Sequence, residues 1–535
     1  MKDRASALQL GIVLAVVALG HLSLAPNVAD LDGVYHIGHA AAYLEGSLFD
    51  TSLPWATRSV IGDIGGDLWW GFHVLLVPFS LLGVGLGLHV AALLLTTLLG
   101  VTTLEVLRRH GVAGAGWWAA VLLVAVPNVF YRHLMVRPHV ISLAAALLLV
   151  SVLVRGRWWQ ALVLSALVSW VHLSLFWLPP LLAVSYAVVR VPVTVFLGRE
   201  DPDTGVPIRL ALPAVFGGVV LGWLLRPDAL ATAELLNVQL VQLFAQKATE
   251  QPLTFAAELS AIDPGTLLQS AWTFALAWLV TVVVLVRAAV RGRLAGLGQA
   301  RATLVCVSLL VSIAFLGLAL VSARRALEQW VAFGALAMPF AWGLLRSGDP
   351  RAAGATTPTG ARPFPGPIVR AAIAVLVLTH AVWGARLHLL NREVVSFPTD
   401  TLRGVAEYLR ENSEPGELVF HARWDNFGPL LAWNRANRYL GGMDPIFQYA
   451  HDAGAYWEFF YLSADLTTEW TCDAYPCLAG VATDTHEALT DHFGTRWVVV
   501  EPYRNPRFSL YLLNDPRYRV AFETERAALF EVIPE

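Results

Sequence analysis

The sequence predicts a polytopic α-helical membrane protein with about eleven transmembrane helices, followed by a small extracytoplasmic α/β domain. Of the 535 residues, 56% are hydrophobic and 14% are charged, whereas soluble domains carry about 25% charged residues. The mean hydropathy is +0.58. After residue 390 the long apolar runs end and a mixed, more polar sequence begins. These observations predict a helical membrane bundle with a folded domain at its C-terminal end.

Charge and cysteine content narrow the functional classes. The net charge of −3 gives no basic surface, so we expect the lipid bilayer as a partner and no nucleic acid. Three cysteines are too few for a disulfide framework. Twenty tryptophans are typical of side chains that anchor a bundle at the membrane interface.

Each membrane span is predicted from an apolar stretch near the length that a bilayer needs, about 20 residues. The stretch at 8–24 resembles a signal peptide that ends at Ala25, but Pro26 disfavours cleavage, so we interpret it as an uncleaved first span. The stretch at 72–106 is longer than needed, which predicts either a tilted helix or an interfacial turn. The other stretches lie near residues 115–131, 139–154, 159–176, 177–197, 208–225, 265–287, 302–322, 327–345 and 368–390.

Basic residues fall on every second loop between these spans, beginning with Lys2 and Arg4. Such loops face the cytoplasm, which predicts a cytoplasmic N-terminus in the inner or plasma membrane. The predicted domains are a transmembrane domain, residues 1–390, and an extracytoplasmic α/β domain, residues 391–535. The outer face then holds loops 25–70, 132–138, 226–264 and 323–326 together with the tail.

Two of these segments have a pattern of their own. Outer loop 226–264 is predicted to be helical and amphipathic, with Leu235, Val238, Val241 and Phe244 on its apolar face. A linker rich in Gly, Pro, Ala and Thr covers residues 346–367.

The tail alternates helical and strand patterns. Cys472 and Cys477 fall within it, outside the cytoplasm, where a disulfide can form. Strands are predicted in E-L-V-F-H, in R-W-V-V-V-E and in two short segments near 517–531, with helices at 399–412, 425–433, 446–463 and 484–493.

The first outer loop carries the most suggestive polar residues. Asp30 and Asp32 are two apart, and His36 and His39 follow, with His36 on the face of Asp32 if a helix begins there. Carboxylates and imidazoles grouped at a membrane boundary suit general-base catalysis or metal binding. The alternative is that an Asp only caps the helix. Asp63 and Asp67, which lie among glycines further on, are interpreted as loop-capping residues.

Arginines on the outer face are unusual, because positively charged residues are normally concentrated in cytoplasmic loops. Each of them is therefore a candidate for a specific function. The segment S-A-R-R-A-L-E-Q-W places Arg324 and Arg325 at a late span end, three or four residues before Glu328. A planar guanidinium binds phosphate well, and the alternative is snorkelling toward lipid headgroups. His172, near another outer span end, is a candidate cavity residue or a satisfied bundle histidine. The outer arginines are Arg58, Arg132, Arg137, Arg226, Arg324 and Arg325.

The first outer loop resembles that of the GT-C superfamily of membrane glycosyltransferases. The segment D-G-V-Y-H-I-G-H-A-A-A-Y-L-E-G is similar to the first loop of oligosaccharyltransferase catalytic subunits and their bacterial relatives. The resemblance covers the layout of most of the chain and implies a polyprenyl-phosphate sugar donor. It implies that Asp30 or Asp32 is the base or a metal ligand, and that Arg324 or Arg325 binds the lipid phosphate.

The sequence also departs from the family pattern. The second outer loop reads V-R-P-H, with Arg137 and His139, where some relatives carry an acidic motif, which argues against a tightly bound metal. A divalent cofactor such as Mg or Mn on Asp30 and Asp32 is therefore left open. The tail has no clear W-W-D-x-G-type motif, which argues against a peptide acceptor and leaves a glycan, lipid or other protein group open.

The sequence thus predicts a glycosyltransferase that acts on the outer face of the membrane. We expect the acidic loop and the arginine pair to face one extracytoplasmic pocket. A non-catalytic transporter or lipid-handling protein is the alternative, and a structural subunit is a third reading. The predicted catalytic residues are Asp32 and Asp30, and the predicted substrate-binding residues are Arg324, Arg325, Arg137, His36, His39, His139, His172 and Glu328.

Overall fold

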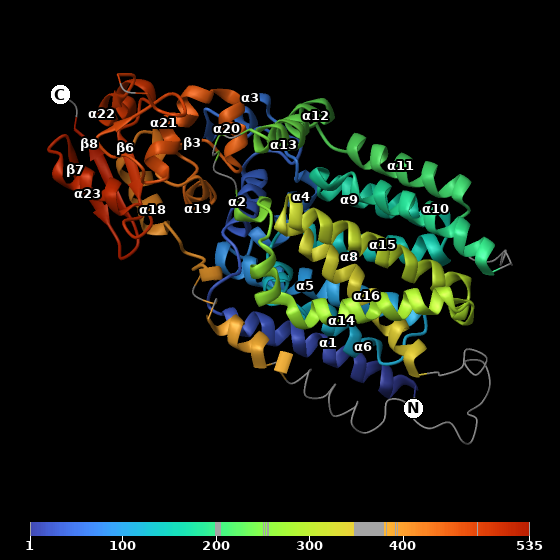
Figure 1. Ribbon diagram of the computed structural model, residues 1–535. Helices are drawn as coiled ribbons and strands as arrows, with labels where there is room; N and C mark the ends of the chain where they lie inside the picture. Colours follow the sequence, from blue (N-terminus) through green and yellow to red (C-terminus); the bar gives the residue numbers. More distant parts are fainter. Residues whose placement is uncertain are drawn as a thin grey trace. The chain divides into compact units, whose positions relative to one another are not determined.

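The structure is a computed structural model of the chain (Figure 1). It describes residues 2–197, 205–249, 251, 253, 256–346, 379–380, 382–390, 392, 394–478 and 480–533. The chain groups into two compact units. Unit 1 comprises Met1–Ala29, Ala92–Trp223 and Ala257–Ser396, and unit 2 comprises Asp30–Ala91, Leu224–Ala256 and Phe397–Glu535. The first outer loop and the tail therefore belong to one unit.

Unit 1 is a helical bundle. Its α8, rich in alanine, is its most buried span, because α9, α10 and α15 all pack against it (Figure 1). Its helices are α1 (Lys2–Leu24), most of α5 (Val84–Arg109), α6 (Ala115–Val124), α7 (Pro127–His133), α8 (Pro138–Arg155), α9 (Trp158–Val171), α10 (Leu178–Leu197), α11 (Ile208–Leu224), α14 (Pro264–Val290), α15 (Gln299–Val321) and α16 (Leu327–Arg346). Short 3-10 helices are η1 (Leu173–Leu175), η3 (Ala257–Leu259), η4 (Arg293–Leu297) and η5 (Arg324–Ala326).

The prediction of a polytopic membrane protein is confirmed. Among the described residues, six helices are long and apolar enough to cross a membrane, or up to seven if the bent pair Ile208–Leu224 and Ala229–Lys247 is one span. The total of eleven stays a prediction. The linker predicted at 346–367 lies outside the described residues from residue 347 on, as does the first part of the span at 368–390.

Unit 2 combines helices with a sheet. Its helices are α2 (Asp32–Glu45), α3 (Val60–Ile64), α4 (Trp70–Ser80), α12 (Ala229–Leu236), η2 (Asn237–Gln242), α13 (Leu243–Lys247), α18 (Arg403–Asn412), η7 (Trp424–Asn426), α19 (Phe427–Trp433), α20 (Pro445–His451), α21 (Ala453–Ser463), α22 (Thr485–Glu487), η8 (Ala488–His492) and α23 (Pro506–Asn514). The disulfide Cys472–Cys477 forms within this unit.

The six-stranded sheet has the order β1-β3-β2-β6-β8-β7. Its first four strands are parallel, and β8 and β7 are antiparallel. A second sheet pairs β4 (Trp470–Thr471) with β5 (Thr483–Asp484). The strands of the large sheet are β1 (Ala56–Thr57), β2 (Leu418–His421), β3 (Arg438–Leu440), β6 (Trp497–Val500), β7 (Tyr518–Glu523) and β8 (Ala528–Val532).

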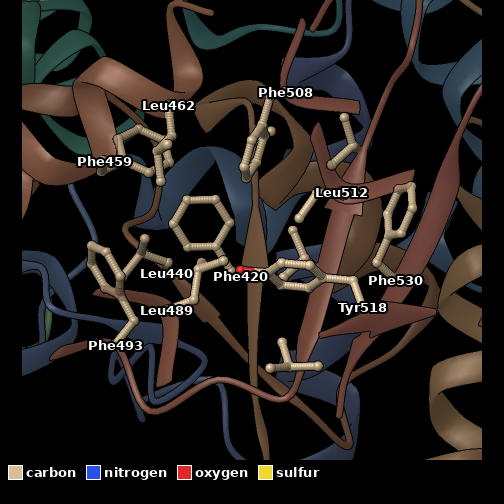
Figure 2. Close-up of a cluster of buried hydrophobic side chains, with 14 of the residues drawn as sticks. Phe420, Leu440, Phe459, Leu462, Leu489, Phe493, Phe508, Leu512, Tyr518 and Phe530 are labelled. Atoms are coloured by element: carbon tan, nitrogen blue, oxygen red, sulfur yellow. The ribbon is translucent and has the colours of Figure 1, made fainter. Parts of the chain in front are cut away.

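Apolar strands at the centre of the sheet build the core of the tail. Strand β6 is buried along its whole length, as expected for a Val-rich central strand. Figure 2 shows Phe420 of β2 with Phe459, Phe493 and Phe508 around it, and their ring centroids lie 5.4–6.4 Å from that of Phe420. This cluster anchors α21 and α23 on the sheet.

The first outer loop is built into this sheet. Strand β1 pairs in parallel with β3, with Ala56 opposite Tyr439. Next to it, α2 packs on α19 at close range, since a Cβ on Gly38 would lie 2.8 Å from the Cα of Ala432. The tail sheet therefore holds the loop that carries the predicted catalytic residues.

Two predicted helices are interrupted. The long apolar stretch at 72–106 breaks at a turn before Gly83, which has a φ of +78°, so the stretch does contain a turn, and the place of that turn at a membrane interface stays a prediction. The loop at 226–264 is helical over Ala229–Lys247, but the π-helical η2 shifts the register there by one residue. Leu235 and Val238 are therefore buried, whereas Val241 and Phe244, predicted on the same apolar face, are exposed.

Candidate functional site

A buried polar cluster lies between α2 and α4 in unit 2. Tyr35, His39 and Tyr43 follow one another at four-residue spacing and share a face of α2. Asp67 and His73 lie across from them, on the turn before α4 and on α4 itself. We call these five residues, together with His36, the first-loop cluster, and all six are buried.

Asp67 accepts hydrogen bonds from several groups in and around this cluster. Its Oδ2 accepts hydrogen bonds from Tyr43 Oη at 2.7 Å and from His73 Nδ1 at 2.5 Å, and its Oδ1 accepts one from the Trp69 amide at 2.8 Å. The Arg226 guanidinium donates to its backbone carbonyl. Burial alone would raise the pKa of Asp67, but the histidines and Arg226 outweigh it, and the net pKa is lowered. The carboxylate is therefore ionised.

The three histidines are held in fixed orientations. His36 Nδ1 lies 2.7 Å from His73 Nε2, and His39 Nδ1 lies 2.9 Å from the hydroxyl of Tyr35. The rings of His39 and His73 are 4.3 Å apart between centroids. Burial and the neighbouring His73 lower the pKa of His39 to about 3, so this imidazole is neutral at physiological pH. Its Nε2 is buried and lacks a hydrogen-bond partner among the described residues.

A pocket of about 200 Å³ opens beside His39 and Tyr43. Its remaining wall mixes apolar and polar residues, and is formed by Ala42, Glu45, Gly46, Ser47, Asp50, Ser52, Pro54 and Trp55. The cluster is thus next to a space that a small ligand can enter.

One ligand atom each from His39, Asp67 and His73 lie within 4.8 Å of one another, so these side chains can hold a metal ion. The predicted metal ligands, Asp30 and Asp32, are not among the three. Asp30 is buried ahead of α2, and Asp32 occupies the first turn of that helix, where a carboxylate is favoured by the helix dipole.

A second charged group lies in unit 1, at the ends of predicted spans. Arg132 forms ion pairs with both Glu258 of η3 and Glu328 of α16. Arg137 Nη1 lies 3.1 Å from Glu258 Oε1, and His139 Nε2 lies 3.6 Å from Glu328 Oε2. We call these five residues the arginine–glutamate network.

The charges in this network reinforce one another. Burial would raise the pKa of Glu258, but Arg132, Arg137 and Arg325 outweigh it and hold the pKa well below its ordinary value. The two glutamates likewise raise the pKa of Arg132 against the effect of its burial. Arg325 is half-buried and Arg324 is exposed. The network therefore contains an ionised Glu258 carboxylate that orients Arg132 and Arg137 at a predicted membrane boundary.

The structure thus brings together several of the predicted residues. Arg137, His139, Glu328 and Arg325 meet around Arg132 and Glu258, and His36 and His39 meet in the first-loop cluster. His172 Nδ1 lies 3.2 Å from the hydroxyl of Ser142, one turn along α8 from His139. The sequence interpretation missed the central roles of Asp67, His73 and Glu258.

The signals for these residues were present but weak. Asp67 stands among glycines and was interpreted as a turn residue, and it does bond the amide of Trp69 two residues on. His73 begins an apolar run, which favours a membrane span over the short helix α4. Glu258 has no motif around it. A histidine six residues after an isolated Asp was the one pattern that could have pointed to the pair.

Comparison with known proteins defines the fold. No protein-family model matches the chain, and no curated protein matches it. ArnT from Cupriavidus metallidurans in the apo state matches with a TM-score of 0.54 and 12% identity over 98% of each chain. The same protein bound to undecaprenyl phosphate matches with a TM-score of 0.52 over 99% of this chain and 98% of its own, at 12% identity.

A further match is the archaeal oligosaccharyltransferase AglB from Archaeoglobus fulgidus, in complex with an inhibitory peptide and a dolichol-phosphate. It has a TM-score of 0.53 and 12% identity, and the match covers 98% of this chain and 74% of AglB. The resemblance to GT-C glycosyltransferases is thus confirmed at the level of the fold, over nearly the whole chain.

Proposed function

We propose that this chain is a membrane glycosyltransferase that moves a sugar from a polyprenyl-phosphate donor to an acceptor on the extracytoplasmic face. The observation that carries the proposal is the fold match along the full length of ArnT, including its complex with undecaprenyl phosphate. Such a likeness supports the general kind of reaction. The roles of individual residues are argued from their chemistry.

The arginines of unit 1 are proposed to bind the donor phosphate. Arg324 is exposed and Arg325 half-buried, at the N-terminal end of α16, and Arg137 shares Glu258 with Arg132. A guanidinium can make two parallel hydrogen bonds to a phosphate, and a carboxylate partner fixes its orientation beforehand. Glu258 and Glu328 are therefore proposed as positioning residues for arginines that stabilise the phosphate as it leaves.

Asp32 is proposed as the general base, with Asp30 as the second candidate. In the reaction the acceptor hydroxyl loses its proton to the carboxylate, its oxygen bonds to the anomeric carbon, and the bond from that carbon to the phosphate oxygen breaks. Polyprenyl phosphate leaves with the bonding electrons, so atoms and charge balance. Asp32 lies in the first turn of α2 and is half-buried, and a carboxylate there is favoured by the helix dipole.

The test is transfer by purified protein from a panel of polyprenyl-phosphate sugars. Asp32→Asn should lower kcat by about 10²–10⁴-fold, the usual contribution of a general base. Glu105→Gln is the control, because it removes an exposed carboxylate that pairs only with Arg109 four residues on. Full activity of Asp32→Asn would remove that residue from the mechanism. Sugar-lipid flux in liposomes without any transfer would instead support the transporter or lipid-handling alternative.

A further inference from the structure

We infer that His39, Asp67 and His73 form a transition-metal centre, that zinc is the ion that fits it best, and that one coordination position opens into the adjoining pocket. This site differs from the Asp30 and Asp32 pair predicted from the sequence. The inference goes beyond the proposed function and stands without it.

The donor atoms favour a transition metal over magnesium. Two imidazoles and one carboxylate present one ligand atom each within 4.8 Å of one another, and all three side chains are buried. Magnesium and calcium select oxygen ligands, whereas imidazole suits zinc and its neighbours in the first transition row. Two histidines and a carboxylate form a ligand set that catalytic zinc sites use.

A second observation is the set of groups behind the ligands. Tyr35 holds His39 Nδ1 at 2.9 Å, His36 holds His73 Nε2 at 2.7 Å, and Tyr43 donates to Asp67 at 2.7 Å. Each ligand is therefore oriented by one dedicated partner, as is usual around protein metal ions. Because His39 Nδ1 contacts Tyr35, Nε2 is the nitrogen of His39 that remains to bind an ion.

His39 Nε2 is itself evidence for a ligand. It is buried and has no hydrogen-bond partner among the described residues. A buried nitrogen with an unused lone pair or proton is unfavourable unless something binds it.

The pocket supplies the open position. His39 and Tyr43 line a space of about 200 Å³. Three protein ligands leave one position of a tetrahedral zinc ion, which a water molecule or a hydroxylated ligand takes in sites that carry out chemistry. Structural zinc sites, in contrast, are closed by a fourth protein ligand.

The experiment is metal analysis of the full-length protein, purified in detergent without added chelator and then incubated with zinc or magnesium. We expect about one zinc ion and no magnesium per chain, as for a single site with three protein ligands. His39→Ala and His73→Ala should each lose the zinc, while His451→Ala should keep it. His451 is the matched control because it also pairs with an aspartate, Asp63, at 2.5 Å in the same unit, but at an exposed site.

The melting temperature is a second measurement, which distinguishes loss of zinc binding from failure of a variant to fold. Zinc should raise the melting temperature of the wild type and of His451→Ala, and leave that of monodisperse His39→Ala unchanged. His36→Ala should bind zinc with an affinity lowered about 10–100-fold, as expected for a second layer of contacts. The inference would be overturned if the wild type took up no zinc, or if His39→Ala and His73→Ala retained as much zinc as the wild type. The cluster would then be a set of hydrogen-bonded histidines and not a metal centre.

Discussion

His73 donates a hydrogen bond from Nδ1 to Oδ2 of Asp67 at 2.5 Å, and both side chains are buried. The two residues are six apart, and the start of α4 brings them together. We expect Asp67→Asn to destabilise the fold by about 2–3 kcal/mol, because hydrogen bonds to a charged group are worth about 1.5–3 kcal/mol. Chemical or thermal unfolding measures this. The control is Asp63→Asn, whose exposed pair with His451 should cost less than about 1 kcal/mol. Equal effects of both changes would contradict the central role of Asp67.

The close packing of α2 on α19 predicts a second effect. A Cβ on Gly38 would meet the backbone of Ala432 at 2.8 Å, so Gly38→Ala should destabilise by about 1–3 kcal/mol through overpacking. At Gly11, a helical glycine on α1, a Cβ would meet nothing within 4 Å. Gly11→Ala should therefore be neutral or slightly stabilising. Melting temperatures of the two variants compare them directly, and a neutral Gly38→Ala would show that the helices can separate at no cost.

Arg132 joins the half-buried carboxylate of Glu258 and the buried carboxylate of Glu328, which gives a third prediction. Replacing it by Met leaves Glu258 and Glu328 without their shared partner and should cost about 3–5 kcal/mol. Arg109→Met breaks an exposed pair with Glu105 and should change stability by less than about 0.5 kcal/mol. If restoring charge balance by Glu258→Gln fails to recover any of the loss in Arg132→Met, the network does not act through charge.

The lowered pKa of Glu258 gives stability a defined pH dependence. Its ordinary pKa is 4.5, and Arg132, Arg137 and Arg325 hold it well below that value despite burial. The unfolded chain thus takes up the proton at a higher pH than the folded chain. The stabilisation is complete above pH 4.5 and is lost as the pH falls through the folded-state pKa.

The corresponding measurement is unfolding of the wild type and Glu258→Gln from neutral to acid pH. The wild type should be the more stable at pH 7, by about 1.5–3 kcal/mol for hydrogen bonds to a charged group, and the difference should shrink on acidification. Glu105→Gln should follow the wild-type profile throughout. If the difference in the free energy of unfolding between the wild type and Glu258→Gln does not vary with pH, the Glu258 carboxylate is not the source of the pH dependence.

Donor binding gives the fifth prediction. Arg324→Ala and Arg325→Ala should each raise KM for a polyprenyl-phosphate sugar about 10-fold or more, since a charge-assisted hydrogen bond is worth about 1.5–3 kcal/mol. Arg291→Ala, at the predicted cytoplasmic end of α14, serves as the control and should leave KM unchanged. An unchanged KM in both test variants would remove the pair from donor binding.

Much of the tail could be predicted from sequence because its elements are local. The run Trp497–Val500 holds three consecutive β-branched valines and is followed by a turn, and it forms a strand, as does Leu418–His421. Helix α18 has the amphipathic period that the segment 399–412 shows. Patterns of this kind depend on neighbours within a few residues, so they predict the element without knowledge of contacts with distant parts of the chain.

The rest depends on contacts between distant parts of the chain. Strand β1 has two residues and exists only because Ala56 and Thr57 pair with β3 some 380 residues later. The link between His39, Asp67 and His73 likewise requires α2 and α4 to pack. Sequence reasoning selected His36 and His39 from this loop, whereas the contact of His36 with His73 and that of His73 with Asp67 depend on packing between the two helices. That the acidic loop and the Arg324–Arg325 pair share one pocket stays a prediction.

The most direct test of the account is a count of products in a single-turnover reaction with a polyprenyl-phosphate sugar and a mixture of candidate acceptors. Mass spectrometry should find one polyprenyl phosphate released for each sugar joined to an acceptor, with both products lost together in Asp32→Asn. The claim that this chain is a glycosyltransferase would be contradicted if the wild type transferred no sugar and the donor stayed intact while it crossed or bound the bilayer.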